Sequence, residues 1–315
     1  MTNDTNSMIN KSLNVNSLSP IALFVFNRPR HTRLTVEALC HNELAAESDL
    51  FVFSDGPRSD NDFKAVQEVR DYIRSITGFH QVTIIERHRN LGLAQSIILG
   101  VTEIVNRYGR IVVFEDDLVT SRFFLKFMND AFSVYENESK VMHISGGTYP
   151  IDDFSATDTY FLRIPLCWGW GTWKRAWDSF NKNIDIMKKF DNRMIAKFNF
   201  DGTYPFWEQL ELNKNGQLRT WFVFLYATIF LHEALALFPS KSLVNNIGHD
   251  GSGVHCDKSD AYDVELSQYP INVMPIALEE SRESFIRHKK YFRCQHSKLY
   301  LKIFQKIRRA AKRVF

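Results

Sequence analysis

The segment Ile111-Val112-Val113-Phe114-Glu115-Asp116-Asp117-Leu118 joins an apolar run to three consecutive acids. Four apolar residues predict a short buried β-strand, and three carboxylates follow where that strand ends. Carboxylates packed this closely raise each other's pKa unless a cation lies among them. Oxygen ligands suit Mg²⁺ or Mn²⁺, and open α/β sheets bind ligands at the carboxyl ends of their strands. We therefore expect Asp117, with Asp116 beside it, to hold a metal that carries a diphosphate. The alternative is a solvated acidic turn.

Strand and helix patterns alternate on both sides of this stretch. Helical spacing of apolar residues separates five predicted strands, which are residues 21–26, 50–53, 82–85, 111–114 and 141–144. Regular alternation with short joints predicts a mostly parallel sheet with helices on both faces. We assign residues 20–150 to this half of an α/β protein.

The second half, residues 151–280, loses the alternation and predicts a smaller α+β unit. Strands are expected at 160–164 and 235–238, and helices after Lys174 and from Phe206. Residues 167–173 predict an aromatic and glycine-rich loop, whose Trp side chains either stack on sugars or belong to the core. A second glycine-rich loop, 245–255, contains His249 and His255 but lacks the lysine and Ser/Thr spacing of a P-loop.

Composition excludes several classes of protein. The 315 residues are 44% hydrophobic, which is enough for a full core. The four cysteines lie far apart without a CxxC pair, which argues against a disulfide framework and fits a reducing, cytoplasmic compartment. Residues 1–19 are polar and predict a disordered leader rather than a signal peptide. The longest apolar run, 221–231, is shorter than the ~18 residues of a membrane span and predicts a buried core helix.

The charge is unevenly distributed. Residues 282–315 contain twelve Lys or Arg and one acidic residue, a net +11, which leaves −8 for the rest of a chain of net charge +3. Within the segment 281–315, one helical face is apolar and basic residues surround it, which is typical of a helix that binds anionic membrane surfaces. We expect contact with the inner face of the membrane; a solvated tail is the alternative. No nucleic-acid-binding module accompanies the charge.

Polar side chains follow the first three predicted strands as well. Arg28, Asp55 and Asn90 come directly after them, with Arg87 near Asn90. In a doubly wound sheet these loops line one crevice. A carboxylate can accept the imide N–H of uracil, and an arginine can stack on a base or pair with a phosphate. Singly these are ordinary turn residues, but together they predict a nucleotide-diphosphate site.

These segments resemble a known group of enzymes. Residues 21–28, Ser54-Asp55 and Glu115-Asp116-Asp117-Leu118 are similar to the nucleotide-sugar half of GT-A glycosyltransferases, especially the N-acetylglucosaminyltransferase I family. Trp168-Gly169-Trp170 resembles that family's acceptor-side segment, Phe206-Trp207-Glu208 its Phe-Trp-Asp-Asp segment, and residues 246–255 its phosphate-contacting loop. Bacterial family 2-like sugar transferases have a similar layout.

The resemblance implies a metal-dependent, inverting transferase of polysaccharide or lipopolysaccharide synthesis. The donor would be a UDP-sugar, for example UDP-N-acetylglucosamine, and the acceptor a hydroxyl of a glycan or lipid-linked molecule. Asp117 would bind Mn²⁺ or Mg²⁺. Glu115 and Asp116 would face the ribose or sugar, Arg28 and Asp55 would hold uracil, and His255 would contact phosphate or metal.

The catalytic base is the least direct assignment. Glu208 is the candidate, although it replaces an aspartate and Gln209 follows it; Asp178 and Asp153 are the alternatives. Glu208 could equally be an acid that complements a helix dipole.

Two other functions fit the same pattern. One is a non-catalytic carbohydrate- or nucleotide-binding protein on this fold. The other is a nucleotidyltransferase, which would normally carry a glycine-rich loop after the first strand, where this chain has Asn27-Arg28-Pro29-Arg30.

Overall fold

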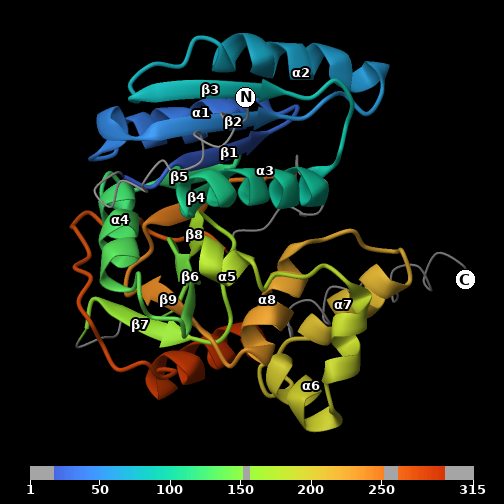
Figure 1. Cartoon of the computed structure of the whole chain (residues 1–315), viewed down its shortest axis with the longest axis vertical. Helices are drawn as coiled ribbons and strands as arrows, with labels where there is room; N and C mark the ends of the chain where they lie inside the picture. Colours follow the sequence, from blue (N-terminus) through green and yellow to red (C-terminus); the bar gives the residue numbers. More distant parts are fainter. Residues whose placement is uncertain (1–17, 152–156, 252–261, 295–315) are drawn as a thin grey trace, which may run out of the picture.

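The computed structural model describes residues 18–151, 157–251 and 262–294. Its centre is one eight-stranded sheet of order β3-β2-β1-β4-β8-β6-β9-β7 (Figure 1). The strands are β1 (Ile21–Val25), β2 (Asp49–Ser54), β3 (Gln81–Glu86), β4 (Arg110–Glu115), β6 (Val141–Ser145), β7 (Thr159–Leu162), β8 (Trp170–Trp173) and β9 (Leu235–Pro239). β1 to β4 are mutually parallel, and so are β6 and β9, whereas β8 and β7 run antiparallel to their neighbours. The predicted α/β class with a mostly parallel sheet is confirmed.

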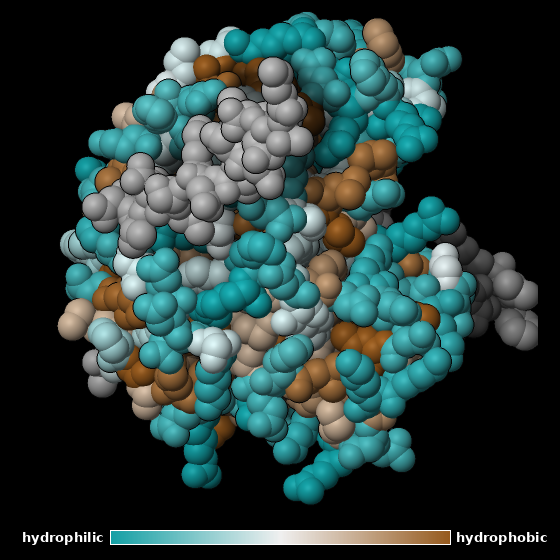
Figure 2. Space-filling model, in the orientation of Figure 1, coloured by the Kyte–Doolittle hydropathy of each residue, from teal (hydrophilic) through white to brown (hydrophobic). Residues whose placement is uncertain are grey.

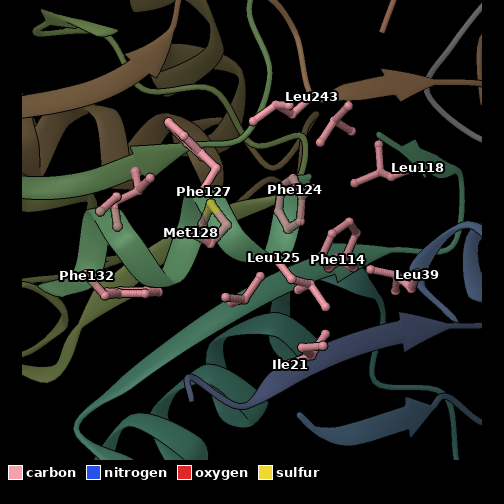
Figure 3. Packing of buried hydrophobic residues seen from close by; sticks show 14 of the residues in the cluster. Ile21, Leu39, Phe114, Leu118, Phe124, Leu125, Phe127, Met128, Phe132 and Leu243 are labelled. Atoms are coloured by element: carbon pink, nitrogen blue, oxygen red, sulfur yellow. The ribbon is translucent and has the colours of Figure 1, made fainter. Parts of the chain in front are cut away.

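Alternate residues of the strands pack on opposite faces, as a pleated strand requires. Ile21 and Leu23 join one buried cluster, which includes Leu39, Phe114 and Phe124 (Figure 3). The helices that contribute side chains to this cluster are α1 (Pro29–Cys40), α2 (Asp60–Ile73) and α4 (Phe124–Val134). Ala22 and Phe24 face a second cluster with α3 (Leu93–Tyr108), α5 (Lys174–Trp177) and α8 (Phe222–Leu231). Helices therefore cover both faces, and α8 is the buried helix expected at 221–231.

Strand β8 corrects the prediction of a loop at 167–173. Trp170 is fully buried and stacks on Trp221 and His143 at ring distances of 5.2 and 5.4 Å. A β-carbon on Gly171 would lie 2.7 Å from side chains of Met128 and Phe132, so α4 packs closely over the strand. Trp170 and Trp173 therefore belong to the core. β8 also lies between β4 and β6, so strands from the two predicted halves share one sheet.

A third cluster forms a helical lobe beside the sheet (Figure 1). It contains η2 (Ile184–Lys189), α6 (Asn192–Phe198), α7 (Phe206–Lys214) and one side of α8. The helix over 282–294 packs here through Phe292, which contacts the ring of Phe206. The surface is indented between this lobe and the part that holds β1–β3 (Figure 2). No helix in the described part of the chain is both long and apolar enough to cross a membrane. Residues 1–17 of the predicted leader and 295–315 of the predicted tail lie outside the described residues.

A small second sheet positions the acidic turn. β5 (Leu118–Thr120) directly follows the turn and pairs antiparallel with β10 (Val244–Asn246). Away from this second sheet, the short 3₁₀-helix η1 (Ala45–Glu47) directly precedes β2. Because β10 opens the predicted glycine-rich loop, the pairing brings that loop onto the turn after β4. Residues far apart in the sequence therefore meet at the carboxyl edge of the parallel strands.

Candidate functional site

The backbone of the acidic turn is held from two sides. On one side, Thr35 of α1 donates its hydroxyl to the carbonyl of Asp116 at 2.9 Å and accepts the Leu118 amide at 3.1 Å. On the other, the amide of Ile247 donates to the carbonyl of Asp117 at 2.9 Å. The turn therefore presents its carboxylates from a fixed backbone.

Arg28 supplies a cation to these carboxylates. Its Nη2 atom donates to Oδ1 of Asp116 and, at 2.8 Å, to Oδ2 of Asp117. β1 and β4 are paired neighbours, so the residues that follow them meet at one edge. Burial by itself lowers the pKa of Arg28, but the carboxylates of Asp116 and Asp117 outweigh it and raise the pKa above its ordinary value. The sequence predicted that Arg28 and the acids line one crevice, with Arg28 holding uracil and a metal among the acids; it did not predict that Arg28 itself bonds to Asp116 and Asp117.

The third acid of the turn has a different charge state. Burial, together with the nearby negative charges of Asp117 and Asp116, raises the pKa of Glu115 to about 8, and the positive charge of Arg28 opposes this shift. Glu115 is therefore mostly protonated at neutral pH and able to donate a hydrogen bond. Burial also raises the pKa of Asp116, while Arg28 opposes that shift.

The loop after β10 closes against Asp117. A β-carbon built on Gly248 would lie 2.0 Å from Oδ2 of Asp117, so only glycine fits without displacing that carboxylate. His249 follows; its ring stacks on Tyr262 at 4.4 Å and meets Trp168 edge-on at 6.0 Å. Among the described residues, its buried Nε2 atom has no hydrogen-bond partner. Burial lowers the pKa of His249, and the negative charges of Asp117 and Asp263 oppose this.

His31 is a site residue that the sequence analysis missed. Its Nε2 atom lies 3.1 Å from Oδ2 of Asp250, and the side chain is buried near Asp116. The bridge ties α1 to the loop after β10. The available signal was its position three residues after Arg28, which places it on the same side of a helix that begins at Pro29.

Asp55 and Asn90 lock two strand ends together. Oδ1 of Asp55 accepts the amide of Leu91 at 2.9 Å, and Oδ2 accepts that of Gly92 at 2.9 Å. Asn90 donates through Nδ2 to the carbonyl of Gly56 at 2.8 Å. The amide of Asp55 donates to Val25 at 3.0 Å, which ties this edge to β1. Both residues thus shape the predicted nucleotide crevice; uracil would have to use the remaining lone pairs of Asp55.

The proposed bases are not joined to the acidic turn by any contact within the described residues. Glu208 is exposed in the first turn of α7, a helix that packs against α6, α8 and η2. Asp178 pairs with Lys174 at 2.7 Å. It follows β8, whose last residue is paired with Arg110 at the start of β4, so Asp178 lies at the opposite end of the sheet. This position removes Asp178 as a base for chemistry at the acidic turn. His255 and Asp153 lie outside the described residues.

The carboxylates of Asp116 and Asp117 fit a divalent cation by two criteria. Their oxygens are the donors that Mg²⁺ and Mn²⁺ prefer, and one positively charged group, the guanidinium of Arg28, already lies between them. In the described part of the chain, no three His, Cys, Asp or Glu side chains are grouped to hold a metal. Magnesium is commonly held by one or two carboxylates and completed by substrate phosphates, so two aspartates are a sufficient protein contribution.

The sheet and the acidic turn at its edge define an α/β protein with a large, mostly parallel sheet flanked by helices. No family model matches the chain, and no curated protein matches it. Among solved structures it is similar to S. aureus TarS, a glycosyltransferase, with a TM-score of 0.31 and 11% identity over 45% of this chain and 24% of that chain. For S. aureus TarS 1-349 the values are 0.42 and 11%, over 74% and 61%. This chain thus spans less than two thirds of either structure, and such weak similarity assigns it to no family.

Proposed function

We propose that the protein is a glycosyltransferase that moves a sugar from a UDP-sugar to a hydroxyl of a glycan or lipid-linked acceptor. The observation that supports this most is the convergence of Arg28, the acidic turn and the Gly248 loop at the carboxyl edge of the parallel strands. The loops locked by Asp55 and Asn90 lie along the same edge. This is where open α/β sheets bind nucleotides.

Each site residue has a role in this proposal. Asp117 and Asp116 hold Mn²⁺ or Mg²⁺, which when bound would stabilise the negative charge of the departing UDP. Glu115 faces the ribose or the sugar of the donor. The 90–92 loop anchored on Asp55 frames the uracil.

The acceptor side is proposed from the aromatic neighbours of His249. Trp168 is partly exposed and borders His249, which itself lies beside Asp117. An aromatic face in this position can stack on an acceptor sugar. We propose Glu208 as the general base, a role that typically contributes ~10²–10⁴-fold to the rate. A single displacement assisted by Glu208 inverts the anomeric carbon.

The direct test is a donor screen. Release of UDP from several UDP-sugars is measured with Mn²⁺ for the wild type, Asp117→Ala and Asp130→Ala. Asp130 is an exposed aspartate paired with Lys126, so its variant controls for the loss of a carboxylate. We expect the rate of UDP release to fall by about 10²-fold or more in Asp117→Ala, because the negative charge on the leaving group is no longer stabilised. Wild-type turnover in Asp117→Ala would overturn the assignment.

A second candidate function is a non-catalytic UDP- or carbohydrate-binding protein. The specific observation in its favour is that the guanidinium of Arg28 neutralises part of the charge of Asp116 and Asp117. This candidate requires UDP to bind equally well with and without Mn²⁺. It also requires that no UDP-sugar in the screen is turned over.

We further propose that the protein acts at the inner face of the cytoplasmic membrane through its basic tail. The support is the charge of +11 over residues 282–315, since each basic residue near anionic lipid contributes about 1 kcal/mol. Deletion of residues 298–315 should abolish co-sedimentation with phosphatidylserine vesicles while leaving turnover of a soluble acceptor intact. Unchanged co-sedimentation would exclude the tail as the anchor.

A further inference from the structure

We propose that Arg28 is the resident counterion of the Asp116–Asp117 pair and exchanges with a divalent cation. When the cation binds, the guanidinium is released and becomes available to the diphosphate of the donor. This inference rests on the proposed function, because it assigns Arg28 a part in donor binding.

The geometry makes the two cations mutually exclusive. One atom, Nη2 of Arg28, lies between Oδ1 of Asp116 and Oδ2 of Asp117 and bonds to both. Asp116 and Asp117 would also be the residues that hold a divalent ion. A divalent ion therefore cannot bind between them until the guanidinium has moved.

Net charge gives the exchange a direction. The two aspartates and Arg28 together carry −1. A diphosphate is repelled by this net charge. A divalent ion neutralises the aspartate pair, and the released guanidinium then adds a positive charge that can pair with phosphate in a bidentate manner. Metal and nucleotide are thus expected to bind cooperatively.

Arg28 is the partner that is free to move. Its side chain is 20% exposed, compared with 7% for Asp116 and 14% for Asp117. The aspartates sit on a turn fixed by Thr35 and Ile247. The backbone of Arg28 is held as well, because its carbonyl accepts the Thr32 amide at 2.9 Å, so the movement is confined to the flexible side chain.

The test measures Mn²⁺ affinity without nucleotide, by calorimetry, for the wild type, Arg28→Gln and Arg58→Gln. Arg58 pairs with Asp62 near the same edge and is the matched control. Loss of a competing positive charge within hydrogen-bond distance should tighten Mn²⁺ binding about tenfold in Arg28→Gln and leave Arg58→Gln unchanged. Equal or weaker Mn²⁺ binding by folded Arg28→Gln would overturn the exchange.

A measurement on the wild type keeps the inference testable if Arg28→Gln does not fold. Added Mg²⁺ should shift the side-chain Nε–H NMR signal of Arg28 but not that of Arg58; a static Arg28 signal at saturating Mg²⁺ overturns the proposal. The two proposals fail separately. Tighter Mn²⁺ binding by Arg28→Gln without any UDP-sugar turnover rejects only the transferase. Mn²⁺-dependent turnover with unchanged metal affinity in Arg28→Gln rejects only the exchange.

Discussion

Gly248 lies directly against Asp117, and a β-carbon at Gly248 would be 2.0 Å from Oδ2 and 2.8 Å from the carboxyl carbon of that residue. Gly248→Ala must therefore push the carboxylate aside or move the loop. Because a displacement of about 1 Å can cost 10²-fold in rate, we expect at least a tenfold loss of Mn²⁺-dependent UDP release. Thermal unfolding of the variant serves as the control for folding. A variant with wild-type turnover would show that this close approach has no functional role.

Asp55 is predicted to be a structural anchor of the nucleotide crevice. Its carboxylate accepts amides of Leu91 and Gly92, and hydrogen bonds to a charged group contribute roughly 1.5–3 kcal/mol each. Asp55→Ala should lower the free energy of unfolding by at least that amount in denaturant titrations. Asp71→Ala, which removes an exposed partner of Arg74, should change it by no more than about 0.5 kcal/mol. Equal effects of the two substitutions would refute the anchoring role.

The assignment of the base is tested by Glu208→Gln. If Glu208 accepts the acceptor's proton, turnover should fall by about 10²–10⁴-fold while UDP affinity stays constant. Glu211→Gln is the matched control, because Glu211 lies on the same helix and bonds only to the Trp207 indole in the described contacts. If both variants turn over like the wild type, Glu208 is a surface acid of the α7 N-terminus.

Two buried histidines, His143 and His288, are expected to lower the free energy of unfolding in acid. Burial lowers the pKa of His143 from 6.5 to about 3, with the carbonyl of Leu166 opposing, and that of His288 to about 4. Below pH 6.5 the two imidazoles bind protons in the unfolded chain, whereas in the folded chain they stay neutral down to their lowered pKa values. The free energy of unfolding should therefore fall as pH falls from 6.5 towards 4, with each group contributing about 1.4 kcal/mol per pH unit.

The comparison of variants isolates the contribution of His143. His143→Phe keeps an aromatic ring against Trp170 and should reduce the slope of unfolding free energy against pH between 6 and 4. His41→Gln, which changes an exposed residue, should leave that slope unchanged. An unaltered slope in His143→Phe would mean that its imidazole already titrates normally in the folded protein.

Secondary structure was predictable from the sequence where the spacing of apolar residues within a short segment determines it. The strands at 21–25, 110–115 and 141–145 are short apolar runs between amphipathic helices, and the structure confirms each of them. β8 was missed because Gly169 and Gly171 are typical of a turn, whereas contact with Met128 and Phe132 of α4 stabilises an extended strand. Tertiary packing decided its structure.

The site was predictable in outline but not in its contacts. Placement of Arg28, Asp55 and the acidic turn at one edge follows from parallel strand pairing. The pairing of β5 with β10 joins three-residue strands more than a hundred positions apart, and no local pattern signals it. The direct bond from Arg28 to Asp117 likewise depends on β1 lying next to β4, which the sequence pattern does not specify.

Calorimetry of UDP binding to the wild-type protein, with and without Mn²⁺, decides whether the acidic turn is a metal site for the nucleotide. We predict that UDP binds tightly only when Mn²⁺ is present, because the acidic turn otherwise repels the diphosphate. UDP binding that is equally strong without the metal, or that is absent under both conditions, would contradict this prediction.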